Sequence, residues 1–185
     1  MKIGIIEGSL RNGRTGAAVA AWVAERAQEH AAQLTGVETE HIVLADFDVP
    51  LLTSATVPGA AQRQYDDERV TAWGAKIDEC DAFIFVTPEY NHSVPGGFKN
   101  AFDSIAPEWQ DKPVAFVGYG ASGGVRAVEA WRLVVSNFNM HAVRTQLEIS
   151  IFRDFEDGEF IASERRAASF TGLMDQLLAA AGHTD

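Results

Sequence analysis

The sequence predicts an α/β fold in which helices cover both faces of a five-stranded parallel sheet. Apolar runs of strand length alternate with segments of helical periodicity from one end of the 185 residues to the other, and this alternation is typical of parallel, doubly wound sheets. The runs at 82–87 and 113–119 are almost wholly apolar, as expected for strands buried on both faces. Right-handed crossovers then favour the strand order 2-1-3-4-5.

Each expected element has its own signal. Apolar or alternating runs predict strands at 2–7, 37–45, 82–87, 113–119 and 143–149. Apolar residues at helical spacing predict helices at 15–34, 66–79, 97–105, 122–138 and 163–181. The strand at 143–149 alternates apolar with polar residues, which is typical of an edge strand with one wet face. Residues 46–65 hold two prolines without a clear period, and we expect a surface excursion there.

Composition narrows the class of protein. The length suits a single domain over 1–185. The net charge of −11 argues against nucleic acid or an anionic membrane as a partner. No apolar run approaches membrane-spanning length, and the first strand makes a poor signal peptide. Cys80 is the single cysteine, so no intrachain disulfide is expected and the cytoplasm is the default location.

A ligand is expected beyond the carboxyl ends of the strands, where the loops after strands 1, 3 and 4 meet. The first loop, 8–16, reads GSLRNGRTG and opens a helix. Its glycines and the helix N-terminus favour an anion. Hydroxyls of Ser9 and Thr15, with the guanidinium of Arg11 or Arg14, suit a phosphate monoester. Two arginines in so short a turn of an acidic chain favour a phosphate-binding site over a glycine-rich turn with a simple helix cap.

The first loop also allows a phosphate-loop phosphotransferase. Gly8, Gly13 and Thr15 stand in Walker A register, but Arg14 replaces the phosphate-binding lysine. The buried strand ends in Thr87 and Pro88 without a magnesium-binding aspartate. This function is therefore the weaker alternative.

The second loop, 87–104, suits a planar ring with a polar edge. Pro88 and Pro95 stiffen it, Tyr90 offers a flat face and a hydroxyl, and Asn91 offers a donor and an acceptor. A rigid loop in which Tyr90 simply packs explains the same residues equally well.

The third loop, 118–127, reads GYGASGGVRA and contains a G-x-G-x-x-G match. Residues 130–147 contain no acid for a ribose, and the loop follows the fourth strand, so a Rossmann site is rejected. Backbone N–H groups around Ser122 to Gly124 could instead bond ring carbonyls. Arg126 could contact a ligand or form a salt bridge.

Together the three loops resemble the NADPH-dependent FMN reductase family of the flavodoxin-like superfamily. The motifs are the Gly-Ser-x-Arg turn, the Pro-Glu-Tyr-Asn run at 88–91 with the following Pro-Gly and Lys-Asn, and a Ser-Gly-Gly-x-Arg-Ala run at 122–127. The resemblance extends to about Arg144 and implies a flavodoxin-like three-layer sandwich. Many relatives carry a serine where this chain has Arg14, Thr15 and Gly16.

The resemblance implies a role for each loop. The first would hold the FMN phosphate, the second would line the isoalloxazine, and the third would face its pyrimidine edge. The implied binding residues are Ser9, Arg11, Arg14, Thr15, Gly16, Pro88, Glu89, Tyr90, Asn91, Ser122, Gly123 and Gly124. Family members are commonly homodimers or homotetramers that pair through the helices after the second and third loops. Phe98, Phe102, Val128, Trp131, Leu133 and Val135 suit either that interface or the core.

The implied function is an FMN-dependent oxidoreductase that passes electrons from NADPH or NADH to a flavin, a quinone or a similar small acceptor. The flavin carries the redox chemistry, so we expect no catalytic side chain. The five histidines lack metal-ligand spacing, so no metal is expected. A non-enzymatic flavodoxin-type electron carrier is the other alternative, although the Pro-Glu-Tyr-Asn loop favours a reductase.

Overall fold

The computed structural model describes residues 1–183 and contains the predicted sheet. Its five parallel strands are ordered β2-β1-β3-β4-β5, which confirms the expected order. Their bounds are β1 Lys2–Glu7, β2 Glu38–Val43, β3 Ala82–Pro88, β4 Val114–Gly120 and β5 Ala142–Ser150. Val143, Leu147 and Ile149 of β5 are buried while Arg144 and Glu148 are exposed, so β5 is the edge strand that the alternation predicted.

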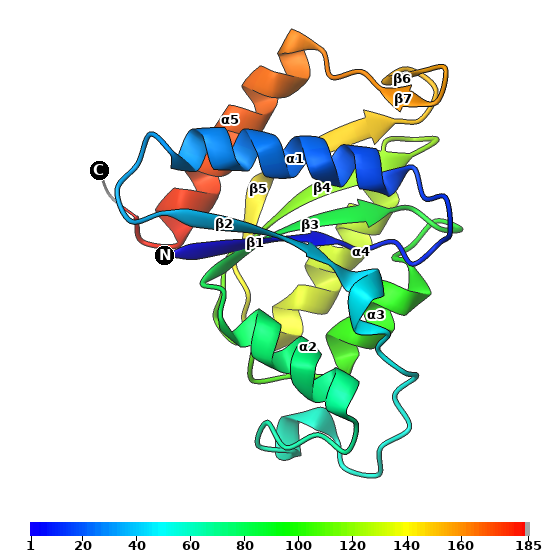
Figure 1. The fold of residues 1–185 in the computed structure, drawn as a ribbon, viewed down its shortest axis with the longest axis vertical. Coiled ribbons are helices and arrows are strands. Elements are labelled where there is room, and N and C mark those ends of the chain that lie inside the picture. Colours follow the sequence, from blue (N-terminus) through cyan, green and yellow to red (C-terminus); the bar gives the residue numbers. More distant parts are fainter. Residues whose placement is uncertain (184–185) are drawn as a thin grey trace.

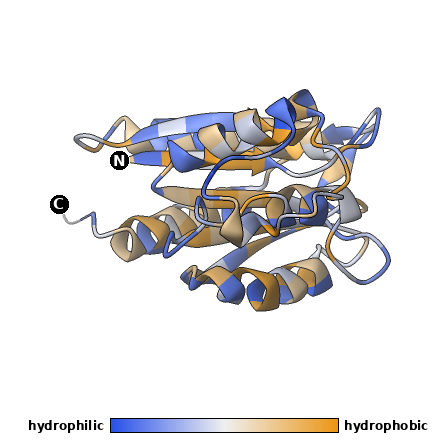
Figure 2. Cartoon of the chain, turned by 90° about the horizontal axis from the view of Figure 1, so that it is seen from below, coloured by the Kyte–Doolittle hydropathy of each residue, from blue (hydrophilic) through white to orange (hydrophobic). Residues whose placement is uncertain are grey.

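Helices cover both faces of the sheet (Figure 1). The helices α1 (Gly16–Ala31) and α5 (Glu164–Ala180) pack on one face, and α2 (Glu68–Asp78), α3 (Gly96–Asp103) and α4 (Val125–Val135) pack on the other. Hydrophobic residues concentrate between the layers (Figure 2). Of the six residues considered for an interface, only Leu133 is exposed, at 79%, because the other five belong to the core beneath α3 and α4.

The excursion at 46–65 is tied to the body of the protein. It follows the short helix η1 (Leu44–Phe47) and contains η2 (Pro58–Ala60). The amide of Asn100 donates to the Pro50 carbonyl at 2.8 Å and accepts from the Leu52 N–H at 2.9 Å. At its far end, the Tyr65 hydroxyl donates to the buried Glu108 carboxylate at 2.8 Å.

The structure differs from the expected elements in two places. The helix expected at 122–138 begins only at Val125 and gives way to the short helix η3 (Ser136–Phe138). Between β5 and α5, an unpredicted hairpin pairs β6 (Phe155–Glu156) with β7 (Glu159–Phe160). Its turn is Asp157-Gly158, with φ of 49° and 87°. An Asp-Gly pair favours this kind of two-residue hairpin turn.

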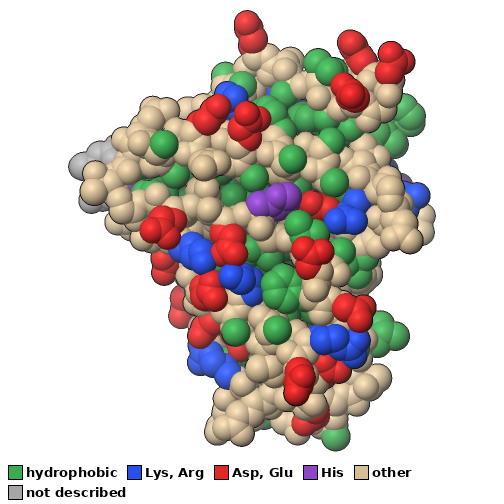
Figure 3. All heavy atoms as spheres, in the orientation of Figure 1, with side chains coloured by type: hydrophobic (Ala, Val, Ile, Leu, Met, Phe, Trp, Pro, Cys, Tyr) green, Lys and Arg blue, Asp and Glu red, His purple; other side chains and the backbone are tan. Residues whose placement is uncertain are grey.

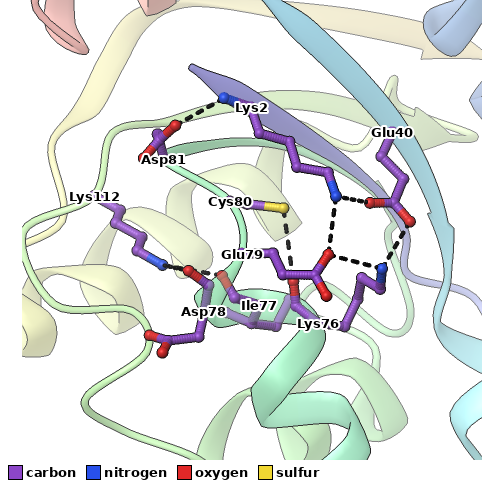
Figure 4. A network of polar contacts seen from close by, with 9 residues as sticks. All are labelled: Lys2, Glu40, Lys76, Ile77, Asp78, Glu79, Cys80, Asp81 and Lys112. Atoms are coloured by element: carbon purple, nitrogen blue, oxygen red, sulfur yellow. Dashed lines mark hydrogen bonds and ion pairs between the residues drawn. The ribbon is translucent and has the colours of Figure 1, made fainter.

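An ion-pair network joins β1, β2 and α2 at the amino ends of the strands (Figure 4). Lys2 Nζ lies 2.6 Å from Glu40 and 2.9 Å from Glu79, and Lys76 Nζ lies 2.9 Å and 3.0 Å from the same two carboxylates. Acidic and basic side chains are likewise interspersed over the face in Figure 3. Because ligands bind at the opposite ends of the strands in such sheets, we assign this network to stability.

Cys80 lies beside this network and is fully buried. Burial raises the pKa of its thiol to about 11, so the thiol is structural. Within residues 1–183, no helix is long and apolar enough to cross a bilayer. No group of three or more His, Cys, Asp or Glu side chains among these residues could hold a metal ion.

Candidate functional site

A cavity of about 250 Å³ opens at the carboxyl ends of β1, β3 and β4. Each of the three loops contributes to its wall. The lining residues are Ser9, Arg11, Arg14, Thr15, Pro88, Glu89, Tyr90, Tyr119, Gly120, Ala121 and Ile151. Residues more than 80 positions apart in the sequence are in direct contact here, since Ser9 Oγ and the Tyr90 hydroxyl share a hydrogen bond of 2.8 Å.

The first loop brings donors to one side of the cavity. Ser9 is buried, and its Oγ also accepts from the Arg11 backbone N–H at 3.4 Å. The Thr15 side chain makes no capping hydrogen bond to α1, and the first turn of α1 carries no acidic residue. The partial positive charge of the helix N-terminus is therefore not offset by a carboxylate of that turn.

Gly16 serves the site through packing and does not line the cavity. A Cβ at this position would lie 2.0 Å from the Tyr119 hydroxyl, so any larger residue would have to displace the buried Tyr119 side chain. Burial raises the pKa of the Tyr119 hydroxyl above its usual range, although a hydrogen bond with Ser9 opposes the shift. Tyr119 is thus neutral and can donate toward the cavity.

Arg14 lines the cavity while its Nε donates to the carboxylate of Glu7. Glu7 ends β1 with only 2% exposure, and its other oxygen lies 3.2 Å from His41 Nε2. Burial opposes ionisation of Glu7, but the hydrogen bonds from His41 and Arg14 outweigh it and lower the pKa. Sequence reasoning missed Glu7 because it reads as the last residue of a strand.

The second loop turns sharply just after the cavity. Tyr90 and Ser93 exchange two backbone hydrogen bonds of 3.1 Å, and the residues between them, Asn91 and His92, have φ of 49° and 70°. Asparagine is favoured in such a turn. Asn91 is exposed and does not line the cavity, whereas Pro88, Glu89 and Tyr90 do.

The third loop lines the cavity with residues that come just before the predicted Ser122–Gly124 segment. Gly120 and Ala121 line it, while Ser122, Gly123 and Gly124 do not. Ser122 is exposed, and both glycines have φ of 73°. A Cβ on Gly124 would lie 2.4 Å from the Tyr119 nitrogen. These glycines therefore shape the turn into α4.

Arg126 joins the third loop to the second. Its backbone N–H donates to Glu89 at 3.1 Å, its Nε donates to the same carboxylate, and its Nη1 lies 2.8 Å from His92 Nε2. Burial opposes ionisation of Glu89, but the Arg126 hydrogen bonds outweigh it and lower the pKa. Of the two roles open for Arg126, the structure shows the salt bridge.

Sequence reasoning did not find Tyr119, Gly120, Ala121 and Ile151. Tyr119 and Gly120 end an apolar strand and resemble core. Ile151 follows β5, and its N–H donates to the Gly120 carbonyl at 3.2 Å. The G-x-G-x-x-G run was the available signal for Gly120.

The pattern of the NADPH-dependent FMN reductase family matches residues 1–154. The chain belongs to this family. The family predicted from the three loops is therefore confirmed. An NAD(P)H-dependent FMN reductase of Nectria sp is 38% identical over 128 residues, which cover 68% of this chain and 63% of that protein. The chain thus matches less than two thirds of that relative.

Two further proteins are similar to this chain, one in sequence and one in fold. A quinone reductase of Pseudomonas putida is 35% identical over 137 residues, covering 70% of this chain and 67% of that protein. A solved flavoenzyme NAD(P)H:(acceptor) oxidoreductase of Paracoccus denitrificans superposes with a TM-score of 0.76 at 21% identity, covering 98% and 97% of the two chains. The structural likeness confirms the flavodoxin-like fold.

Proposed function

We propose that the chain binds FMN in the cavity between the three loops and transfers electrons from NADPH or NADH to a flavin, a quinone or a similar small acceptor. One observation carries the proposal: hydroxyl and guanidinium donors of the first loop face the same cavity as Tyr90 and the ends of β3 and β4. The family supports the choice of cofactor.

The donor set fits a flavin monophosphate. Ser9, Thr15, Arg11 and Arg14 could bind a phosphate at the N-terminus of α1. Pro88, Glu89 and Tyr90, with Gly120 and Ala121, would lie against the ring. The cavity of about 250 Å³ is smaller than pockets that enclose a small molecule, roughly 300–1,000 Å³. A cavity of this size would not enclose a whole flavin, so part of the cofactor would remain open to solvent or to a second substrate.

Asn91, Ser122, Gly123 and Gly124 are proposed as supports of the ring-binding loops, not as direct contacts, because none of the four lines the cavity. When bound, FMN supplies the hydride and electron transfer chemistry. The chain supplies neutral hydroxyls, a fixed second and third loop and a positive phosphate site. We propose no catalytic side chain.

We propose that two copies of the chain pair through α3 and α4. Exposed Leu52 and Leu133 flank a groove of about 560 Å³, which Phe102 and Phe138 also line. Lys99 and Asp103 lie 2.5 Å apart on α3 and line the same groove. Across a twofold axis, Lys99 of each copy could pair with Asp103 of the other copy. A purified protein that elutes only as a monomer in size-exclusion chromatography would contradict the pairing.

We further propose that residues 1–185 act as one domain and that the protein works in the cytoplasm. Residues of α5, beyond the family match, share a hydrophobic core with β5 and α1, which supports one domain; residues 184–185 lie outside the described part. The lone buried Cys80 supports a reducing compartment. Fractionation of cells that express a tagged chain tests the location.

The activity is tested by following NADPH and NADH consumption with a quinone acceptor, with and without added FMN. We expect oxidation that depends on both the protein and FMN. A flavodoxin-type carrier would bind FMN but oxidise neither nucleotide without a partner reductase. A phosphotransferase would bind ATP and remain colourless after incubation with FMN. Either result would overturn the proposal.

A further inference from the structure

Arg14 both lines the cavity and contacts a buried carboxylate. Its Nε donates to the Glu7 carboxylate, and its side chain remains partly accessible beside the cavity. Arg14 lines the cavity and Glu7 does not. From this arrangement we infer that Glu7 is a positioning residue, which fixes the Arg14 guanidinium so that its terminal nitrogens serve the phosphate. The inference rests on the proposed function.

The Glu7 carboxylate is itself held from two directions. Arg14, in the turn before α1, occupies Oε1, and His41, on β2, lies 3.2 Å from Oε2. The Glu7 side chain is only 3% exposed. A carboxylate buried to this degree is costly unless it is paired on both sides. The paired carboxylate therefore provides a rigid anchor for the guanidinium.

The anchor matters because a free arginine side chain loses rotamer entropy when it binds a ligand. Arg14 is partly exposed, with 24% of its side chain accessible. Fixing Nε removes most of this freedom before the phosphate arrives. The competing effect is repulsion between Glu7 and the phosphate. We expect positioning to dominate, because the charge that borders the cavity belongs to Arg14.

The test compares FMN with riboflavin, which lacks the phosphate, by fluorescence titration. The variant E7L removes the acceptor for Arg14 Nε, and E7Q retains an amide oxygen. We expect E7L to weaken FMN binding about tenfold, the equivalent of one charge-assisted hydrogen bond. Riboflavin binding stays within about twofold, and E7Q recovers most of the FMN affinity. Unchanged or tighter FMN binding by E7L, or equal losses for both ligands, would overturn the inference.

The matched control is Glu108, another carboxylate that is 1% exposed and outside the cavity. E108L should lower the unfolding temperature yet keep the ratio of FMN to riboflavin affinity. If E7L does not fold, E7D shortens the side chain while keeping its charge. The same ratio should then fall, and an unchanged ratio for E7D overturns the inference.

A double variant separates this inference from the proposed site. R14A alone should lower FMN affinity, and adding E7L to R14A should cause no further loss, because the anchored group is gone. If R14A and S9A both leave the preference for FMN over riboflavin intact, the proposed phosphate site is wrong. If they lower it and E7L does not, only the role of Glu7 is wrong.

Discussion

Arg126 donates to the Glu89 carboxylate with both its backbone N–H, at 3.1 Å, and its side chain. The pair joins the second loop to the start of α4. Because the Glu89 side chain is only 6% exposed, the joint is shielded from water on one side. The Glu89–Arg126 pair thus holds the two loops that would frame the ring in a fixed relative position.

Breaking this joint should destabilise the fold. In R126A the buried Glu89 carboxylate loses its charged partner. We expect a loss of about 1–2 kcal/mol in the free energy of unfolding, reduced from the cost at a fully buried site because Arg126 is 40% exposed. Urea denaturation measures it. The control is E129Q, which removes an exposed carboxylate on the same helix. It should change the free energy of unfolding by less than about 0.5 kcal/mol. Equal losses in the two variants would argue against the joint.

The same pair predicts a pH dependence. The pKa of Glu89 is lowered in the folded protein, so its contribution is present above the unfolded pKa of roughly 4.3 and is lost as the pH falls through the folded value. The stability difference between the native chain and R126A should be constant near neutral pH and shrink in acid. Urea denaturation across a pH series tests this, and a difference that grows on acidification would contradict it.

A side chain at Gly16 should destabilise the fold. In G16A the new Cβ would meet the Tyr119 hydroxyl at 2.0 Å, so we expect a loss of about 1–3 kcal/mol in stability and weaker FMN binding. Thermal unfolding and fluorescence titration measure the two effects. Gly172, in α5, has nothing within 4 Å of an added Cβ. G172A should therefore be neutral or stabilising, and equal destabilisation of both variants would contradict the close contact.

The two serines of the first and third loops should differ in their effect on FMN. Ser9 is buried, bonded to Tyr90 and lines the cavity, whereas Ser122 is exposed and does not. S9A should weaken FMN binding by about three- to tenfold relative to riboflavin, the equivalent of one hydrogen bond. S122A should change it less than about twofold. A larger loss of FMN affinity in S122A than in S9A would indicate that FMN does not bind in the described cavity.

Much of the fold could be predicted because buried parallel strands carry continuous apolar runs. The runs at Ala82–Pro88 and Val114–Gly120 are almost wholly buried, and helical spacing located α1 and α5 within a few residues. The β6–β7 hairpin was missed because each strand has only two residues, too few for a period. The Asp157-Gly158 pair was the one sequence feature that indicated the hairpin.

The site was predictable only in part. Hydroxyls and arginines in a glycine-rich turn predicted an anion site near Ser9. The contacts of Glu7 with Arg14 and His41 could not be predicted from the sequence, because they depend on how β1, β2 and the first loop pack together. Asn91 and Ser122 belong to the matched motifs, but both are exposed and neither lines the cavity.

A crystal structure of the complex with FMN tests the central claim most directly. We expect the phosphate beside Ser9, Arg11 and Thr15 at the N-terminus of α1, and the ring against Tyr90 and Gly120. A flavin bound with its phosphate away from the first loop, or bound only in the groove between α3 and α4, would contradict the account.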